Sequence, residues 1–348
     1  MEKFVKDSLM NHMESNQLFT NGQHGFRKGR SCITQLIEVM EDWTEHLDNH
    51  NSVDAIYLDS QKAFDTVPHH RLFTKLKGYG ISGNILEWIK NFLSERKQKV
   101  VLNGSDPKWT DVTSGIPQGS VLVSILFTIY INDLPGVVQN VAKLYADDTK
   151  LYATVNNTND ERKLQGDIDR LMQWSKDWLL TFNKSKCKHV HFGPPNNAKY
   201  QMGGDIITQS TEEKDLGITI DEKLTFQIPI NNQTKKANQR LGMIKRSCTY
   251  MDKNMFTTLH KSIVRPHLEY GSNIWSVMNR KEAIQIENVQ RRATKLVKHI
   301  QHLSYSDRSR YLGLPSLQYR RLRSDMVETF RIINNIDKVN SIKKISEK

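Results

Sequence analysis

Two stretches decide the fold, AIYLDSQKAF at residues 55–64 and LYADDTKLY at residues 144–152. The run VDAIYLD at 53–59 is short, β-branched and aromatic, which predicts a buried strand that ends at Asp59. Residues 141–155 alternate weakly around Asp147 and Asp148, which predicts a hairpin with both carboxylates near its tip. Two ionised carboxylates side by side repel each other, and a divalent cation would relieve that repulsion. A plain polar turn is the competing interpretation of the pair.

The flanking sequence predicts mostly helices. Ser31 is a suitable cap for an amphipathic helix, and Gly78 and Gly80 separate two short helices. The run SVLVSILFTIYINDL at 120–134 is too short to span a bilayer and predicts a buried helix. Further expectations are two paired strands at 100–104 and 109–113, an amphipathic helix at 161–180, and helices nearly throughout after Asn232. The predicted fold class is therefore α+β, followed by an all-helical C-terminal part.

Charge divides the chain unevenly. The formal net charge is +12, made up of −3 over residues 1–230 and +15 over residues 231–348. We therefore expect a boundary at the polar stretch 229–234, in preference to the turn-rich stretch 193–205, and domains of 1–230 and 231–348. A basic C-terminal domain is typical of proteins that bind a polyanion with that domain. A solvated basic helical face is an equally good interpretation of the charge alone.

Composition narrows the class of protein. The chain has 348 residues, of which 37% are hydrophobic and 25% charged, so it is neither fibrous nor wholly disordered. Its three cysteines, Cys32, Cys187 and Cys248, form neither a disulfide framework nor a CxxC zinc motif. No signal peptide and no apolar run of about 18 residues is present, which predicts an intracellular protein without a membrane partner.

Further motifs connect these stretches to a known family. Together they resemble the reverse transcriptases of non-LTR (LINE-type, jockey-like) retrotransposons. The matching segments, in chain order, are QHGFRKGRS at 23–31, YLDSQKAFDTVPHHRL at 57–72, SGIPQGSVL at 114–122, YADDTKLY at 145–152, WLLTFNKSKCKHVHFG at 178–193, DLGITID at 215–221, HLEYGSNIWS at 267–276 and IENVQRRATKLV at 286–297.

The resemblance implies a right-hand polymerase, with partial fingers and a palm followed by a helical, basic thumb. Its implied activity is RNA-directed DNA polymerisation, a two-metal transfer of a nucleotide to a primer 3′-OH. Two Mg²⁺ ions would be held by Asp59 and Asp147, with Asp148 as a weaker ligand. Lys186 would protonate the leaving pyrophosphate, although a solvated lysine is an equal alternative.

The same resemblance implies residues that bind the substrates, namely an RNA template, a DNA primer and deoxynucleoside triphosphates. Phe64 would exclude a ribose 2′-OH, and a core phenylalanine is its alternative. Gln118 and Gly119, otherwise an ordinary turn, would contact the incoming nucleotide and the template. The residues expected to contact nucleic acid are Arg27, Lys28, Arg30, Leu216, Gly217, Arg291, Arg292 and Lys295, with Lys298 on the same helical face; an exposed amphipathic face is the alternative for the last four.

Two departures from the family pattern bear on activity. Val123 and Ser124 stand where the family continues PQGSVL with Gly-Pro, and the bulkier Val123 would hinder a close approach. The upstream fingers segment and the N-terminal endonuclease of the family are not matched, so we expect an N-terminally truncated chain. No RNase H is evident either. The alternative to an active polymerase is a non-catalytic, nucleic-acid-binding relic. SQKAFD and the C-terminal match disfavour a group II intron or telomerase-type enzyme. The resemblance to this family implies that the protein acts in the nucleus.

Overall fold

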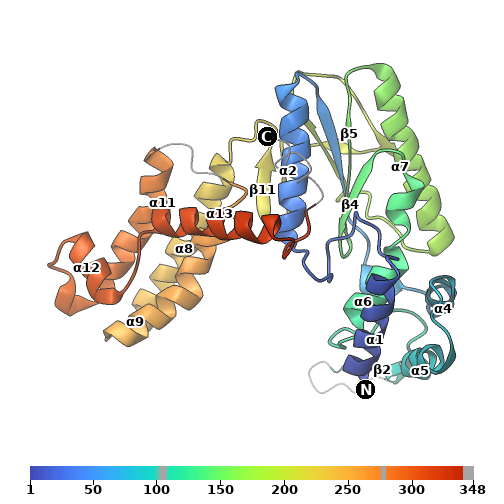
Figure 1. Ribbon diagram of the computed structural model, residues 1–348, viewed down its shortest axis with the longest axis horizontal. Helices are drawn as coiled ribbons and strands as arrows, with labels where there is room; N and C mark the ends of the chain where they lie inside the picture. Colours follow the sequence, from blue (N-terminus) through green and yellow to red (C-terminus); the bar gives the residue numbers. More distant parts are fainter. Residues whose placement is uncertain (100, 102–107, 276–279, 340–348) are drawn as a thin grey trace. The chain divides into compact units, whose positions relative to one another are not determined.

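The computed structural model describes residues 1–99, 101, 108–275 and 280–339 (Figure 1). Its contacts form two compact units, which are described separately. The first unit comprises Met1–Gln35 and Trp43–Thr211, and the second comprises Leu36–Asp42 and the chain from Glu212 onwards. The division into functional domains 1–230 and 231–348 stays a prediction.

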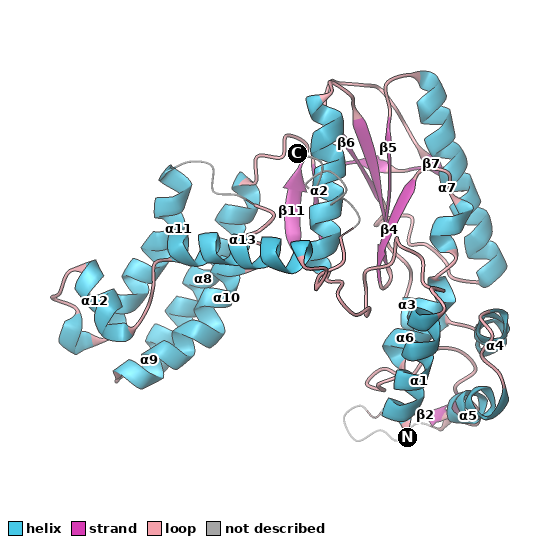
Figure 2. Ribbon diagram, in the orientation of Figure 1, coloured by secondary structure: helices cyan, strands magenta, loops and turns pink. Residues whose placement is uncertain are grey.

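The first unit is built on a five-stranded sheet in the order β4-β5-β1-β6-β9. Figure 2 labels β4, β5 and β6 of this sheet. The central strand β1 has buried residues at five of its six positions, and it is antiparallel to both neighbours. The buried strand predicted before Asp59 is therefore confirmed. The strands of the sheet are β1 (Val53–Leu58), β4 (Val141–Tyr145), β5 (Asp148–Thr154), β6 (Lys188–Phe192) and β9 (Thr208–Gln209).

The predicted hairpin is formed by β4 and β5. Tyr145 pairs with Asp148, so Ala146 and Asp147 alone make the turn. Ala146 has a φ of 56°, in the left-handed region that a residue with a Cβ atom rarely adopts. The turn is thus tight and places Asp147 at its tip.

Helices of the first unit confirm most of the local predictions. The Ser31 hydroxyl accepts the amide of Thr34 at 3.1 Å and caps the helix that follows. The predicted buried helix is seen at 123–131, where every side chain from Ile125 to Ile131 is buried. The helices are α1 (Glu2–Ser15), α2 (Cys32–Asp48, which enters the second unit), α3 (Ala63–Thr66), α4 (His69–Gly78), α5 (Gly83–Leu93), α6 (Val123–Ile131), the 3₁₀-helix η1 (Leu134–Val137) and α7 (Thr158–Trp178).

Two small hairpins complete the first unit. β2 (Lys97–Gln98) pairs with β3 (Thr110–Asp111), whereas most of the strand predicted at 100–104 lies outside the described residues. β7 (Gln201–Met202) pairs with β8 (Asp205–Ile206) across a two-glycine turn, as the composition of 193–205 predicts.

The second unit begins with a hairpin and continues as helices. The break expected at 229–234 is not seen, because these residues form the first turns of α8. Pro229 is tolerated there because a backbone amide in the first turn of a helix has no intrahelical acceptor, so the missing amide costs little. Its elements are β10 (Glu212–Asp215), β11 (Ile218–Asp221), α8 (Gln227–Ser247), α9 (Lys253–Leu259), the π-turn η2 (His260–Val264), α10 (Arg265–Glu269), α11 (Arg280–Ala293), the 3₁₀-turns η3 (Thr294–Leu296) and η4 (Lys298–Ile300), α12 (Tyr305–Leu312) and α13 (Leu317–Ile333).

None of the helices in the described ranges has the length and apolar character that a membrane crossing requires.

Candidate active site

Strand pairing brings Asp59 next to the carboxylates of the hairpin turn. Leu58, the last residue of β1, lies opposite Thr149 of β5, so the following residue, Asp59, reaches the level of Asp148. The Asp59 backbone is fixed from the other side, because its carbonyl accepts the amide of Asn183 at 2.7 Å. Two carboxylate positions that are 88 residues apart in sequence therefore meet at one end of the sheet.

Burial and a neighbouring charge act on Asp147. Its pKa is raised above the ordinary value, first because the site is desolvated and also because the negative charge of Asp59 lies close by. Asp148 is the first residue of β5, and its side chain is exposed. Desolvation and the neighbouring carboxylate of Asp59 therefore both disfavour the ionised form of Asp147.

Lys186 lies beside the same carboxylates. Its Nζ is 3.6 Å from Oδ2 of Asp59, and its side chain is 64% exposed. The turn that carries Lys186 starts at Asn183, whose amide binds the Asp59 carbonyl. An exposed pair of this kind contributes little to stability, so the lysine remains available to another anion.

The chemistry of this set fits a hard divalent cation. In the described part of the chain, no group of three or more His, Cys, Asp or Glu side chains is arranged to hold a metal ion. Mg²⁺ does not require such a group, because it is commonly bound through one or two carboxylates together with substrate phosphates and water. Asp59 and Asp147 supply the two carboxylates at one place.

The residues expected at the nucleotide lie on α3 and on the turn before α6. The ring of Phe64 is half-buried and packs on Phe127, with 4.4 Å between ring centroids. Gln118 donates its amide to Asp65 at 2.9 Å, so Asp65 orients the Gln118 side chain. Gly119 has a φ of 93°, a conformation that explains the glycine.

A polar cavity of about 610 Å³ adjoins Gln118. It is lined by Lys62, Arg96, Lys97 and Asp65, among other residues of α3, β2 and the strand–turn segment before α6. Val123, which replaces the family's glycine, starts α6 and packs in part against the core.

The segment 23–31 has a structural role that its sequence did not disclose. His24 donates its amide to the Leu144 carbonyl, and the Leu144 amide donates to Gly22, both at 2.8 Å, so the segment runs beside β4. The side chain of Arg27 is only 8% exposed, and its guanidinium is bound to Glu14 and to the Thr20 carbonyl. The structure thus commits Arg27 to the protein interior.

The other two cations of this segment differ from Arg27. Arg30 is half-buried and lies 3.0 Å from a ring nitrogen of His24, whereas Lys28 is exposed. Lys28 is therefore the candidate of the three whose position best suits contact with a phosphate.

In the second unit, the hairpin turn of Leu216 and Gly217, which are expected to contact nucleic acid, is supported by Tyr270. Tyr270 donates its hydroxyl to the Leu216 carbonyl at 2.6 Å. Gly217 has a φ of 89°, and a Cβ atom there would lie 3.0 Å from the Tyr270 ring. The turn is therefore fixed in shape and requires glycine.

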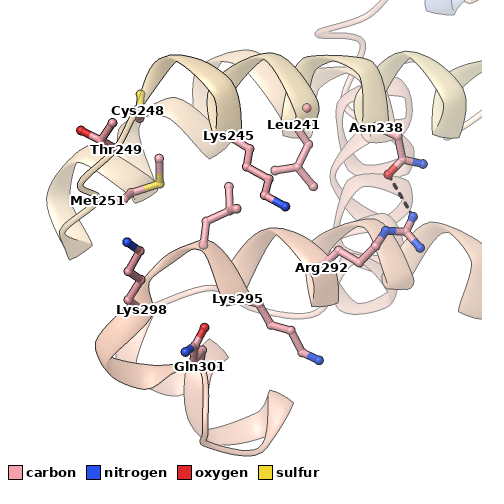
Figure 3. A pocket seen from close by; sticks show the side chains of 12 residues that line it. Asn238, Leu241, Lys245, Cys248, Thr249, Met251, Arg292, Lys295, Lys298 and Gln301 are labelled. Atoms are coloured by element: carbon pink, nitrogen blue, oxygen red, sulfur yellow. Dashed lines mark hydrogen bonds between the residues drawn. The ribbon is translucent and has the colours of Figure 1, made fainter.

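Lys245, Arg292, Lys295 and Lys298 of the second unit line a groove rather than a single helical face (Figure 3). The α8–α11 groove is a cavity of about 780 Å³ with Leu241 and Leu296 on its walls and no carboxylate among the described residues that line it. Its cations are Lys245 of α8, Arg292 of α11, Lys295 of η3 and Lys298 of η4. Lys245 and Lys298 point into the gap, and Arg292 donates to Asn238 at 2.9 Å.

Arg291 does not line this groove. Its guanidinium lies over the ring of Tyr305, 4.9 Å from the centroid. The sequence treats Arg291 and Arg292 as one face, whereas consecutive helical residues point about 100° apart. Lys245, which the sequence analysis missed, takes the place of Arg291, and only the packing of α8 against α11 could reveal it.

Comparison with known proteins identifies the family of this chain. Residues 1–220 match the model of a family described as reverse transcriptase (RNA-dependent DNA polymerase). The chain belongs to the reverse transcriptase family. The matched residues include β1, the β4–β5 turn and the segment before α6, and reverse transcriptases generally use divalent metal ions.

Relatives of this chain come from mobile elements. It is 28% identical over 319 residues to the probable RNA-directed DNA polymerase from transposon BS of Drosophila melanogaster. It is 27% identical over 313 residues to the RNA-directed DNA polymerase from mobile element jockey of the same species. In both cases 85% of this chain is covered, and the chain spans 34% of the relative's length. The resemblance to non-LTR retrotransposon reverse transcriptases is thus confirmed.

Solved structures show the same fold. Apo telomerase from Candida tropicalis superimposes with a TM-score of 0.52 at 12% identity, covering 88% of this chain and 50% of that chain. A telomerase from Candida albicans gives 0.50 at 11% identity, covering 91% and 58%. The predicted right-hand polymerase fold is therefore confirmed.

Proposed function

We propose that this chain carries the catalytic site of an RNA-directed DNA polymerase, which adds deoxynucleotides to a DNA primer on an RNA template. The observation that carries the proposal is the meeting of Asp59 and Asp147 at one end of the sheet, close enough for one charge to raise the pKa of the other. Templated extension of a primer tests it, and the competing function, binding without catalysis, predicts a bound primer that is never extended.

Asp59, Asp147 and the exposed Asp148 would hold two Mg²⁺ ions. When bound, such ions lower the pKa of the attacking 3′-OH and neutralise charge that develops on the transferred phosphate. The carboxylates would set the positions of the ions, because Asp59 and Asp147 are held by the paired strands β1, β4 and β5. A bound cation would relieve the desolvation of Asp147 and its repulsion from Asp59, which are the effects that raise the pKa of Asp147.

Lys186 would act on the leaving group. Its ammonium lies 3.6 Å from Asp59, so it is at the site but not engaged in a tight ion pair. An ammonium there can donate a proton to the departing pyrophosphate oxygen. Lys28, and the cations of the cavity beside Gln118, would contact phosphates of the nucleic acid or of the incoming nucleotide.

Phe64→Val is expected to weaken the discrimination between deoxyribonucleotides and ribonucleotides. Phe127 supports the Phe64 ring, and a rigid ring leaves no space for a 2′-OH. Removing most of the ring should raise the ratio of kcat/KM for ribonucleotides to that for deoxyribonucleotides by about 10- to 100-fold. The ratio is measured by single-nucleotide incorporation.

Phe73→Val is the matched control, because Phe73 packs against the same core from α4. It should leave the sugar ratio unchanged. An unchanged ratio in a folded Phe64→Val chain would contradict the assignment and favour a purely structural phenylalanine.

The α8–α11 groove would bind a phosphodiester backbone. Replacing Lys245, Arg292 and Lys295 by Ala together should weaken primer–template binding. It should also reduce the slope of log affinity against log salt by about 2 to 3, since each lost phosphate contact removes about 0.9. Fluorescence anisotropy between about 50 and 200 mM salt measures both quantities.

Lys236→Ala is the control for this groove. Lys236 is exposed on α8, nine residues before Lys245, which places it on the opposite side of the helix. Its replacement should leave the salt slope unaltered. Equal slopes for the triple variant and the control would show that the groove does not contact phosphates.

A further inference from the structure

We propose that Gln23 is a positioning residue for the carboxylate turn, because its buried side chain holds Ala146 in the conformation that places Asp147. The inference rests on the proposed function, since positioning has a catalytic meaning only if Asp147 is catalytic. Neither Gln23 nor Ala146 has a role in the assignment above.

The contact joins segments 123 residues apart. Gln23 is fully buried, and its Oε1 accepts the amide of Gly25 at 2.7 Å and that of Ala146 at 3.2 Å. Ala146 directly precedes Asp147 and has a φ of 56°. A left-handed alanine persists only when its surroundings fix it, and here the fixing atom is a side-chain oxygen.

The backbone around Gln23 makes this contact specific. The hydrogen bonds between His24, Leu144 and Gly22 align the segment with β4. A Cβ atom on Gly25 would lie 2.4 Å from the Ala146 nitrogen, so the two backbone segments approach as closely as glycine permits. The segment cannot slide along β4 without breaking these contacts.

The carboxamide acts only as an acceptor here. Both amides in contact need the oxygen, so a rotated carboxamide would lose both hydrogen bonds. Nε2 is buried and has no hydrogen-bond acceptor among the described residues. Gln23→Met therefore removes the acceptor while keeping an unbranched side chain of similar length.

The test compares Gln23→Met, Ala146→Gly and the double variant in primer extension with Mg²⁺. Gln23→Met should lower kcat by about 10- to 100-fold, because the carboxylates are displaced, and should leave primer–template affinity unchanged. Glycine adopts the left-handed conformation without strain, so Ala146→Gly in the Gln23→Met background should restore most of kcat. A purely destabilising change would not be rescued in this way.

Asn132→Ala is the matched control. Asn132 is a buried amide that also joins distant segments, through Thr20, Leu18 and Tyr79. Its replacement should lower thermal stability without a selective loss of kcat, and Ala146→Gly should not rescue it. Equal effects of Gln23→Met and Asn132→Ala, or no rescue of Gln23→Met, would overturn the proposal.

Hydrogen exchange of the Ala146 amide separates this inference from the proposed function. Gln23→Met should accelerate that exchange by about tenfold or more, because its acceptor is lost, and Asn132→Ala should not. If the wild-type chain extends no primer, the proposed function fails while the exchange still tests the contact. Slow exchange retained in Gln23→Met would refute the contact itself.

Discussion

Asp54→Asn is expected to be among the most destabilising single substitutions in this chain. Asp54 is fully buried in β1, with its carboxylate 3.1 Å from His189, 2.6 Å from His191 and 2.6 Å from the Tyr200 hydroxyl. The other ring nitrogen of His191 lies 2.6 Å from the Pro194 carbonyl, so the ring links Asp54 to the backbone that follows β6. Removing the charge of Asp54 should cost about 3 to 5 kcal/mol of unfolding free energy.

The pKa of Asp54 gives this effect a pH dependence. Burial alone would raise that pKa, but the interactions with His189, His191 and Tyr200 outweigh it and hold the pKa well below its usual range. A depressed pKa stabilises the fold above the unfolded-state pKa of about 4, and this contribution is lost as the pH falls further. The difference between wild type and Asp54→Asn should therefore shrink below about pH 4.

Urea unfolding at pH 7 and at lower pH measures this prediction. Asp177→Asn is the control, because Asp177 is exposed on α7 and its replacement should change stability by less than about 0.5 kcal/mol. Equal midpoints for Asp54→Asn and wild type at pH 7 would mean that the cluster around Asp54 does not stabilise the fold.

Local patterns in the sequence predict much of this structure. The strand before Asp59, the hairpin around Asp147 and the helix capped by Ser31 each follow from a few neighbouring residues, because their hydrogen bonds are formed locally or with adjacent strands. The charge of the C-terminal part is likewise a sequence property. What these patterns cannot specify is which side chains from distant segments meet.

The features that the sequence missed all depend on such meetings. The contacts of Gln23 with Ala146 and of Asp54 with Tyr200 join residues 123 and 146 positions apart. Lys245 joins the basic groove only because α8 packs against α11. The helical start of α8 across residues 229–234 was missed because a proline and polar residues indicate a break, although proline is compatible with a first helical turn.

Asp147→Asn should abolish primer extension. It removes a charge from the pair formed with Asp59, and loss of a carboxylate that holds a divalent cation costs several kcal/mol of transition-state stabilisation. The expected fall in kcat is about 10³-fold or more. The fold should survive, because the desolvation that raises the pKa of Asp147 penalises its charge, and a neutral amide relieves that penalty.

Stability measured without metal separates this loss from unfolding. The Tm of Asp147→Asn should equal or exceed that of wild type at pH 7, since the substitution removes a partly desolvated charge next to Asp59. Asp148→Asn should lose less activity, because Asp148 is exposed and is the outer member of the pair. A lower Tm for Asp147→Asn would mean that the lost activity results from a destabilised fold and not from the loss of a metal-binding carboxylate.

The most direct measurement of the central claim is dTMP incorporation on poly(A)–oligo(dT) with Mg²⁺, with wild type and Asp147→Asn side by side. We predict incorporation by wild type and none above background by the folded variant. Incorporation that persists in Asp147→Asn would contradict the assignment of Asp59 and Asp147 as the catalytic carboxylates. A wild-type chain that binds the duplex but incorporates nothing would contradict the polymerase activity itself.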